Sequence, residues 1–165
     1  MIRHASLVAL RLGGRWAGAL VEGPSAAGKS DLALRALETG FRLVSDDGTV
    51  VWASGGALFG RAPGPLDGLI EARGVGILTE SPVWIAQIRL VVACAPEGRE
   101  IERLPDPRAE IIDGIAVARL ELRALEASAP AKMRRAIEHL GRGQQQAYQA
   151  GSPCGQDRAG TGDTF

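Results

Sequence analysis

The sequence predicts an α/β domain in which a mixed β-sheet carries a phosphate-binding loop. Three observations favour this fold class. An apolar strand over residues 17–21 runs into a glycine-rich loop over residues 23–30, and a helical pattern follows directly. Further short apolar segments alternate with glycine turns. Glycine accounts for 22 of the 165 residues, about twice its average share of roughly 7%, which favours a sheet with many tight turns over a helical bundle.

The N-terminal third is expected to form a hairpin and a helix. Residues 6–12 and 16–21 are apolar runs on either side of Gly13-Gly14, an arrangement typical of a β-hairpin. Apolar residues recur at helical spacing over residues 29–37, and Gly40 stands where a helix commonly ends.

The middle of the chain is expected to alternate strands and turns. Strands are predicted over residues 41–44 and 49–53. Five glycine or proline residues within residues 57–68 predict an irregular loop. Residues 69–78 are apolar with interleaved charges, and residues 85–93 form the most continuous apolar strand.

The C-terminal part is expected to hold a charged loop over residues 96–107, a hairpin over residues 111–122 and a helix over residues 131–140. Residues 142–165 are rich in glycine and glutamine and contain few apolar residues, so we expect them to be disordered. The predicted domain therefore spans residues 1–141.

Composition excludes several classes of protein. Nineteen basic and nineteen acidic residues give no net charge, so no nucleic-acid or membrane partner is predicted. No apolar run approaches the roughly 20 residues of a membrane span, and no signal-peptide pattern is present. Cys94 and Cys154 are too few for a disulfide framework, and Cys94 is expected to be buried. We therefore expect a cytoplasmic protein.

The loop matches the pattern Gly-x4-Gly-Lys-Ser between a strand and a helix, the context in which this pattern binds phosphates. Backbone N–H groups and the helix N-terminus would hold the phosphates, Lys29 would reach the terminal ones, and Ser30 would join a magnesium shell. Lys29 is one of only two lysines among the 19 basic residues. The alternative is a glycine-rich turn without a ligand. The predicted cofactors are ATP and Mg²⁺, and the predicted binding residues are Gly23, Pro24, Ser25, Ala26, Ala27, Gly28, Lys29 and Ser30.

An acid that helps to hold magnesium usually follows a second apolar strand in such proteins. The strand over residues 88–93 ends without one. Asp46 and Asp47 follow the strand after the helix and are the best candidates, because strand ends face the ligand crevice in α/β sheets. One carboxylate would take a proton from a hydroxyl and the other would lie near magnesium. The alternative is an exposed Asp-Asp-Gly turn.

Three further residues are candidates. Glu71 and Arg73 alternate with apolar residues, so both are expected on one face of a strand, where they would contact metal and phosphate. A solvated pair of opposite charges is the alternative. His4, at the start of the first strand, suits either a structural or a catalytic role.

Three segments occur in the order found in one known family. Residues 23–31 read GPSAAGKSD, residues 42–47 read RLVSDD and residues 70–77 read IEARGVGI. Together they resemble the catalytic domain of HPr kinase/phosphorylase, most closely its short alphaproteobacterial type, over roughly residues 3–140.

The resemblance implies a nucleotide core like that of phosphoenolpyruvate carboxykinase. It also implies a kinase that phosphorylates a serine of the phosphocarrier HPr, or of its nitrogen-system homologue, together with a reverse reaction that consumes inorganic phosphate. By the same resemblance, Asp46 is the general base and Asp47 its companion acid. His4 and Arg73 belong to the catalytic site, and Glu71 binds metal beside Ser30.

Two departures and two alternatives accompany this hypothesis. Many family members have glycine where this chain has Ala26, so a positive φ there would be strained. The segments that longer relatives use for carrier docking and hexamer contacts are not evident, so a homo-oligomer is only one possible state. The alternative functions are a small-molecule kinase with the same loop and an ATP-binding sensor without catalysis.

Overall fold

Two antiparallel strands, β2 (Ala5–Leu12) and β3 (Arg15–Glu22), form a hairpin inside the main sheet. In the computed structural model, which describes residues 1–140, Gly13 and Gly14 connect these strands with φ angles of 56° and 78°. Both angles lie in the left-handed region that two-residue hairpin turns need, and glycine adopts it without a steric penalty. The predicted hairpin is confirmed.

Strand directions bring several strand ends to one edge of this sheet. β9 (Ala86–Cys94) lies parallel to β3, and β4 (Arg42–Ser45) lies antiparallel to β2 on the other side. Because β3 and β4 both run opposite to β2, the C-terminal ends of β3, β4 and β9 meet where β2 begins. Ala5 is paired with Glu22 there. This edge is where the segments predicted to bind phosphate and metal come together.

The remaining strands widen the sheet. Beyond β9 lie three more strands, β6 (Ala57–Arg61), β5 (Thr49–Ser54) and β1 (Ile2–Arg3). The strand order is therefore β1-β5-β6-β9-β3-β2-β4. β11 (Ile115–Leu122) runs parallel to the second half of β9 and pairs with the antiparallel β10 (Arg108–Ile112). The sheet therefore mixes parallel and antiparallel pairs, as predicted.

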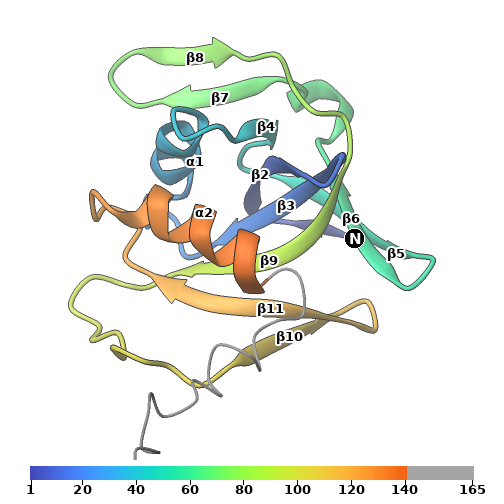
Figure 1. The fold of residues 1–165 in the computed structure, drawn as a ribbon. Helices are drawn as coiled ribbons and strands as arrows, with labels where there is room; N and C mark the ends of the chain where they lie inside the picture. The colour runs from blue at the N-terminus through green and yellow to red at the C-terminus, as the bar shows by residue number, and fades with distance from the viewer. Residues whose placement is uncertain (141–165) are drawn as a thin grey trace, which may run out of the picture.

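Helices α1 (Lys29–Leu37) and α2 (Ala129–His139) cover one face of the sheet, and α2 lies in front of β3 and β9 in Figure 1. Alternate residues of the central strands point to opposite faces. Val8 and Leu10 pack in the cluster that contains both helices, whereas Leu7 and Ala9 pack in the cluster on the opposite face. Burial on both faces explains why the central strands are almost continuously apolar.

A separate two-stranded ribbon lies beyond α1, at the top of Figure 1. Its strands are β7 (Leu69–Ala72) and β8 (Gly76–Thr79), and a short 3₁₀ turn, η1 (Gly64–Leu66), precedes them. Ile70 is buried in the same apolar cluster as α1. The ribbon is thereby held beside the edge where β4 ends.

The loop predicted over residues 57–68 is wrong in its first part, because residues 57–61 form β6. Gly60 explains why a segment rich in glycine is a strand. A Cβ atom at Gly60 would lie 2.6 Å from Leu7 Cδ2 and 3.1 Å from Ile88 Cδ1, so only glycine fits at this crowded position. A glycine required by close packing was interpreted as a turn signal.

Two other sequence predictions concern a membrane span and the C-terminal tail. No helix among residues 1–140 is long and apolar enough to cross a bilayer. The predicted tail over residues 142–165 lies outside the described residues and remains a prediction, as does the domain boundary at residue 141.

Candidate active site

The glycine-rich loop connects β3 to α1 and packs closely on its neighbours at both ends. A Cβ atom at Gly23 would lie 2.8 Å from Cys94 Cβ. Gly28 has a φ of 87°, and a Cβ atom there would lie 2.9 Å from Leu125 Cδ2. Close packing against Cys94 therefore requires glycine at residue 23, and the left-handed backbone conformation favours it at residue 28. The loop shape is set by the ends of β9 and β11 as well as by its own sequence.

Ala26 has a φ of 63°, an angle that few residues other than glycine adopt. It is the third residue of a turn in which the Ala27 N–H donates to the Pro24 carbonyl oxygen at 3.2 Å. Its side chain is exposed, so no packing contact offsets the backbone strain. The strained backbone that a positive φ would cause at Ala26 is therefore present in the structure.

Ala26→Val is expected to lower the free energy of unfolding by about 1–2 kcal/mol, because a β-branched side chain is poorly tolerated at positive φ. Ala26→Gly should leave stability nearly unchanged, since the relief of strain is offset by greater freedom of the unfolded chain. Chemical denaturation measures both. Ala127→Val is the matched control, because Ala127 is also exposed but does not have a positive φ. Equal losses at residues 26 and 127 would show that backbone strain is not the cause.

Lys29, the first residue of α1, is almost completely buried and turns back into the loop. Its Nζ donates hydrogen bonds to the carbonyl oxygens of Gly23 and Pro24, both at 3.1 Å. These bonds hold the ammonium group at the mouth of the loop. Beneath it, burial raises the pKa of the Cys94 thiol to about 11, an effect that the charge of Lys29 partly offsets. Cys94 is a buried free cysteine, as predicted.

Asp46 lies directly after β4 and connects four parts of the chain. It is only 5% exposed. Its Oδ1 accepts hydrogen bonds from Ser6 Oγ at 2.6 Å and from Ser30 Oγ at 2.9 Å. Its Oδ2 accepts one from the backbone N–H of Glu71 at 3.2 Å. A buried carboxylate needs such partners, and here they come from β2, α1 and β7.

A second layer of hydroxyl groups supports this carboxylate. Ser45 and Thr49 lie on either side of the Asp-Asp-Gly turn and are fully buried. Their hydroxyl oxygens are 2.7 Å apart, and Thr49 donates to the carbonyl oxygen of Ala5 at 2.9 Å. The turn is therefore anchored in the sheet rather than freely solvated, which argues against the alternative of a plain exposed turn.

Asp47 and His4 form a second, solvent-facing group beside Asp46. The side chain of Asp47 is 69% exposed, and its φ is 57°. His4 Nδ1 lies 3.1 Å from the Asp47 carbonyl oxygen and 3.3 Å from its Oδ1. The two adjacent aspartates thus have opposite environments. Asp46 is buried with both oxygens engaged, whereas Asp47 faces solvent next to an imidazole.

The positions of Glu71 and Arg73 differ in part from the sequence prediction. Glu71 is in β7 with an exposed side chain, but Arg73 lies in the turn after β7, so the predicted shared strand face is wrong. The turn is formed by a hydrogen bond from the Val75 N–H to the Ala72 carbonyl oxygen. Within residues 1–140, no group of three or more His, Cys, Asp or Glu side chains is arranged to hold a metal ion.

The residue before the loop, Glu22, belongs to an ion-pair network on the sheet. Arg3 Nε lies 2.5 Å from Glu22 Oε1, and a second nitrogen of Arg3 lies 2.7 Å from Glu110 Oε1. Arg119 pairs with Glu110 and lies 3.9 Å from Glu22 Oε2. Because these side chains are half-buried, the network fixes the end of β3 more firmly than an exposed pair would.

Ser6 is a site residue that the sequence analysis missed. It is fully buried in β2 and makes the shortest hydrogen bond to Asp46. The available signal was a serine within the apolar run over residues 5–10, since a buried hydroxyl needs a partner. Its partner, however, is 40 residues away in the sequence.

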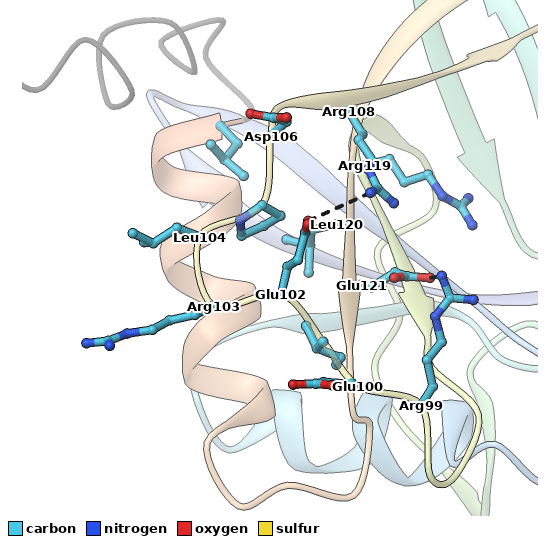
Figure 2. Close-up of a pocket in the computed structure, with 13 residues that line it drawn as sticks. Arg99, Glu100, Glu102, Arg103, Leu104, Asp106, Arg108, Arg119, Leu120 and Glu121 are labelled. Carbon is cyan, nitrogen blue, oxygen red and sulfur yellow. Dashed lines mark ion pairs between the residues drawn. The ribbon is translucent and has the colours of Figure 1, made fainter.

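A cavity of about 800 Å³ lies away from the glycine-rich loop, between residues 99–108, β11 and the end of α2 (Figure 2). Side chains of both charge signs surround it, and Arg99 pairs with Glu121 at 3.2 Å. None of the predicted site residues lines it. The candidate site is therefore the open edge at the loop, where His4, Lys29, Ser30, Asp46 and Asp47 come together with the backbone of Glu71.

Comparison with known proteins identifies one family. The family model described as "HPr Serine kinase C-terminal domain" matches residues 3–92. HPr kinase/phosphorylase of Clostridium botulinum (strain Eklund 17B / Type B) is 41% identical over 67 residues, which are 41% of this chain and 22% of that protein. The protein of the same name from Clostridium beijerinckii is 39% identical over 82 residues, 46% of this chain and 27% of its own length.

A solved structure has a similar fold. The Hpr(Ser) kinase/phosphatase from Coxiella burnetii superposes with a TM-score of 0.72 at 23% identity, covering 90% of this chain and 94% of that one. The Clostridium relatives are much longer than the matched segments, since the matches span only about a quarter of their lengths.

Proposed function

Because this chain belongs to the family of the HPr Serine kinase C-terminal domain, we propose that it transfers the γ-phosphoryl group of ATP to a serine of the phosphocarrier HPr or of its nitrogen-system homologue. The observation that carries the proposal is the extent of the family match. Residues 3–92 include the glycine-rich loop, both adjacent aspartates and the Glu71–Arg73 segment. The proposal includes a cytoplasmic location, where such a carrier would be met.

The loop is suited to a triphosphate. Its glycines allow close approach of the backbone, and α1 presents unpaired N–H groups at its N-terminus. Lys29 would exchange the carbonyl oxygens of Gly23 and Pro24 for phosphate oxygens, which are stronger acceptors because they are charged.

The oxygen-rich group around Ser30 fits Mg²⁺, which prefers oxygen ligands and usually keeps several waters and substrate phosphates. Ser30 would hold the ion directly, with Glu71 from the neighbouring ribbon. When bound, the ion would neutralise charge on the phosphoryl group. Asp46 would orient the Ser30 hydroxyl through the hydrogen bond that it already accepts from it.

The environments of the two aspartates favour a division of roles that differs from the one first expected. Asp46 is buried, and both of its oxygens accept hydrogen bonds. A serine on another protein could not reach it. Asp47 is exposed beside His4, so we propose that Asp47 takes the proton of the incoming hydroxyl while that oxygen forms its bond to phosphorus and ADP departs. Asp46 then acts on the magnesium side.

His4 and Arg73 have supporting roles in this proposal. His4 would hold the Asp47 carboxylate in position through its Nδ1 atom. Arg73 is exposed in the turn of the ribbon and forms no hydrogen bond or ion pair within residues 1–140. A guanidinium in this state can engage a phosphoryl group or an acidic group of the carrier.

Incubation with γ-labelled ATP, magnesium and purified HPr tests the proposal. We expect label on a single serine of HPr, and no label on HPr whose acceptor serine is replaced by alanine. Transfer of label to a small molecule but not to HPr would support the alternative of a small-molecule kinase. ATP binding without transfer would support a sensor. Addition of inorganic phosphate to phosphorylated HPr tests the reverse reaction, and the mass of the protein in solution tests for a homo-oligomer.

A further inference from the structure

Leu125 is a large apolar residue that lies beside the phosphate-binding loop with its side chain exposed to solvent. It follows β11, and its Cδ2 is 2.9 Å from the position that a Cβ atom of Gly28 would occupy. The side chain is nevertheless 72% exposed. Its neighbour Ala124 is buried, and the Cβ atom of Ala124 is 3.3 Å from the same position. Leu125 therefore extends the surface of the loop outward from the point where α1 begins.

The segment that carries Leu125 is firmly attached on both sides. Arg35 of α1 donates hydrogen bonds to the carbonyl oxygen of Ala124 and, at 3.1 Å, to that of Glu126. Arg123 donates to the carbonyl oxygen of Arg99, at 3.1 Å, in the loop that follows β9. The exposed leucine is thus flanked by anchored residues. A preorganised apolar surface of this kind favours binding, because little conformational entropy of the protein is lost when the ligand binds.

The position of Leu125, in the turn just after β11, indicates what it would contact. The glycine-rich loop begins at the edge of the sheet where β9 and β11 also end. Asp46 and Asp47 lie on the other side of β3, after β4. A triphosphate in the loop would point its terminal phosphates toward Asp46 and Ser30. The nucleoside would then extend the other way, over the ends of β9 and β11, in the crevice where α/β sheets bind ligands.

We propose that Leu125 supports the base of the bound nucleotide, packing against the face of the purine ring. The inference rests on the nucleotide-binding function proposed above and adds a subsite to it. Flat aromatic rings bind well on apolar side chains, which line most of the surface in small-molecule sites. The charged side chains beside Leu125 are engaged elsewhere, since Glu126 pairs with Lys132 at 2.5 Å and with Arg123 at 3.7 Å.

Titration calorimetry with Mg-ATP and with inorganic tripolyphosphate tests this subsite, because tripolyphosphate has the phosphates but no base. Leu125→Ala should raise the Kd for ATP by roughly fivefold to tenfold, the loss expected for one partly buried leucine contact. It should leave the Kd for tripolyphosphate unchanged. Leu125→Met keeps the apolar volume and should bind ATP nearly as the wild type does.

Leu104→Ala is the matched control, because Leu104 is 84% exposed and lines the cavity remote from the loop. It should bind both probes normally. ATP binding by Leu125→Ala at wild-type strength would overturn the inference, and so would an equal loss for both probes, which would indicate a distorted loop. If the wild type binds tripolyphosphate as tightly as ATP, there is no base subsite. If it binds neither, the proposed function itself fails.

Discussion

Lys29→Met is expected to abolish phosphoryl transfer, lowering kcat by at least roughly a thousandfold, because the transferred phosphoryl group loses its principal protein cation. In the structure the ammonium is already held at the mouth of the loop by the carbonyl oxygens of Gly23 and Pro24. Lys29→Arg should fail almost as completely. The planar guanidinium is larger than an ammonium and cannot fit the same buried position.

Lys132→Met is a matched control, since Lys132 is the other lysine of the chain and lies half-exposed on α2. It should retain wild-type transfer within about twofold, because its contact is an exposed ion pair. Single-turnover measurement of HPr phosphorylation separates chemistry from nucleotide binding. Transfer at a comparable rate by Lys29→Met would contradict the assignment of this lysine to the reacting phosphates.

The two adjacent aspartates should separate kinetically. Asp47→Asn is expected to lower kcat by roughly 10²–10⁴-fold, the usual loss when a general base is removed, with little change in the magnesium concentration needed for half-maximal rate. Asp46→Asn should raise that magnesium concentration by roughly 10–100-fold, as is common when a group that orients a metal ligand is lost. Initial rates measured across a magnesium series distinguish the two effects.

Asp106→Asn serves as the control for both variants, because Asp106 is exposed on the loop that borders the remote cavity. A fall in kcat for Asp46→Asn at unchanged magnesium dependence, with near-normal Asp47→Asn, would reverse the proposed roles. That result would restore the assignment expected from the sequence, in which Asp46 is the base. Thermal unfolding of Asp46→Asn shows whether the loss of its buried hydrogen bonds also destabilises the fold.

Most of the fold followed from local patterns. The hairpin around Gly13-Gly14, the helix over residues 29–37 and the hairpin predicted over residues 111–122, which in the structure begins at residue 108, were predictable because turn chemistry and apolar spacing act over a few residues. The strand over residues 57–61 was not, since the close approach of Leu7 that requires Gly60 is a contact between distant segments. Arg73 was misplaced for a related reason. The alternation of apolar and charged residues over residues 69–78 predicts one continuous strand, but a tight turn after Ala72 interrupts it.

Sequence alone was enough to predict a phosphate-binding loop at residues 23–30, to show that no acid follows the strand ending at Cys94, and to select Asp46, Asp47 and Glu71 as the candidate acids. These conclusions depend on residue types at short spacing, which the chain displays directly. The three-dimensional arrangement distinguishes the two aspartates, which are adjacent in sequence but opposite in exposure. It also brings Ser6 to Asp46 and Leu125 to Gly28. Such contacts join residues about 40 to 100 positions apart, and they arise only when the sheet brings the C-terminal ends of β3, β4, β9 and β11 and the start of β2 to one edge.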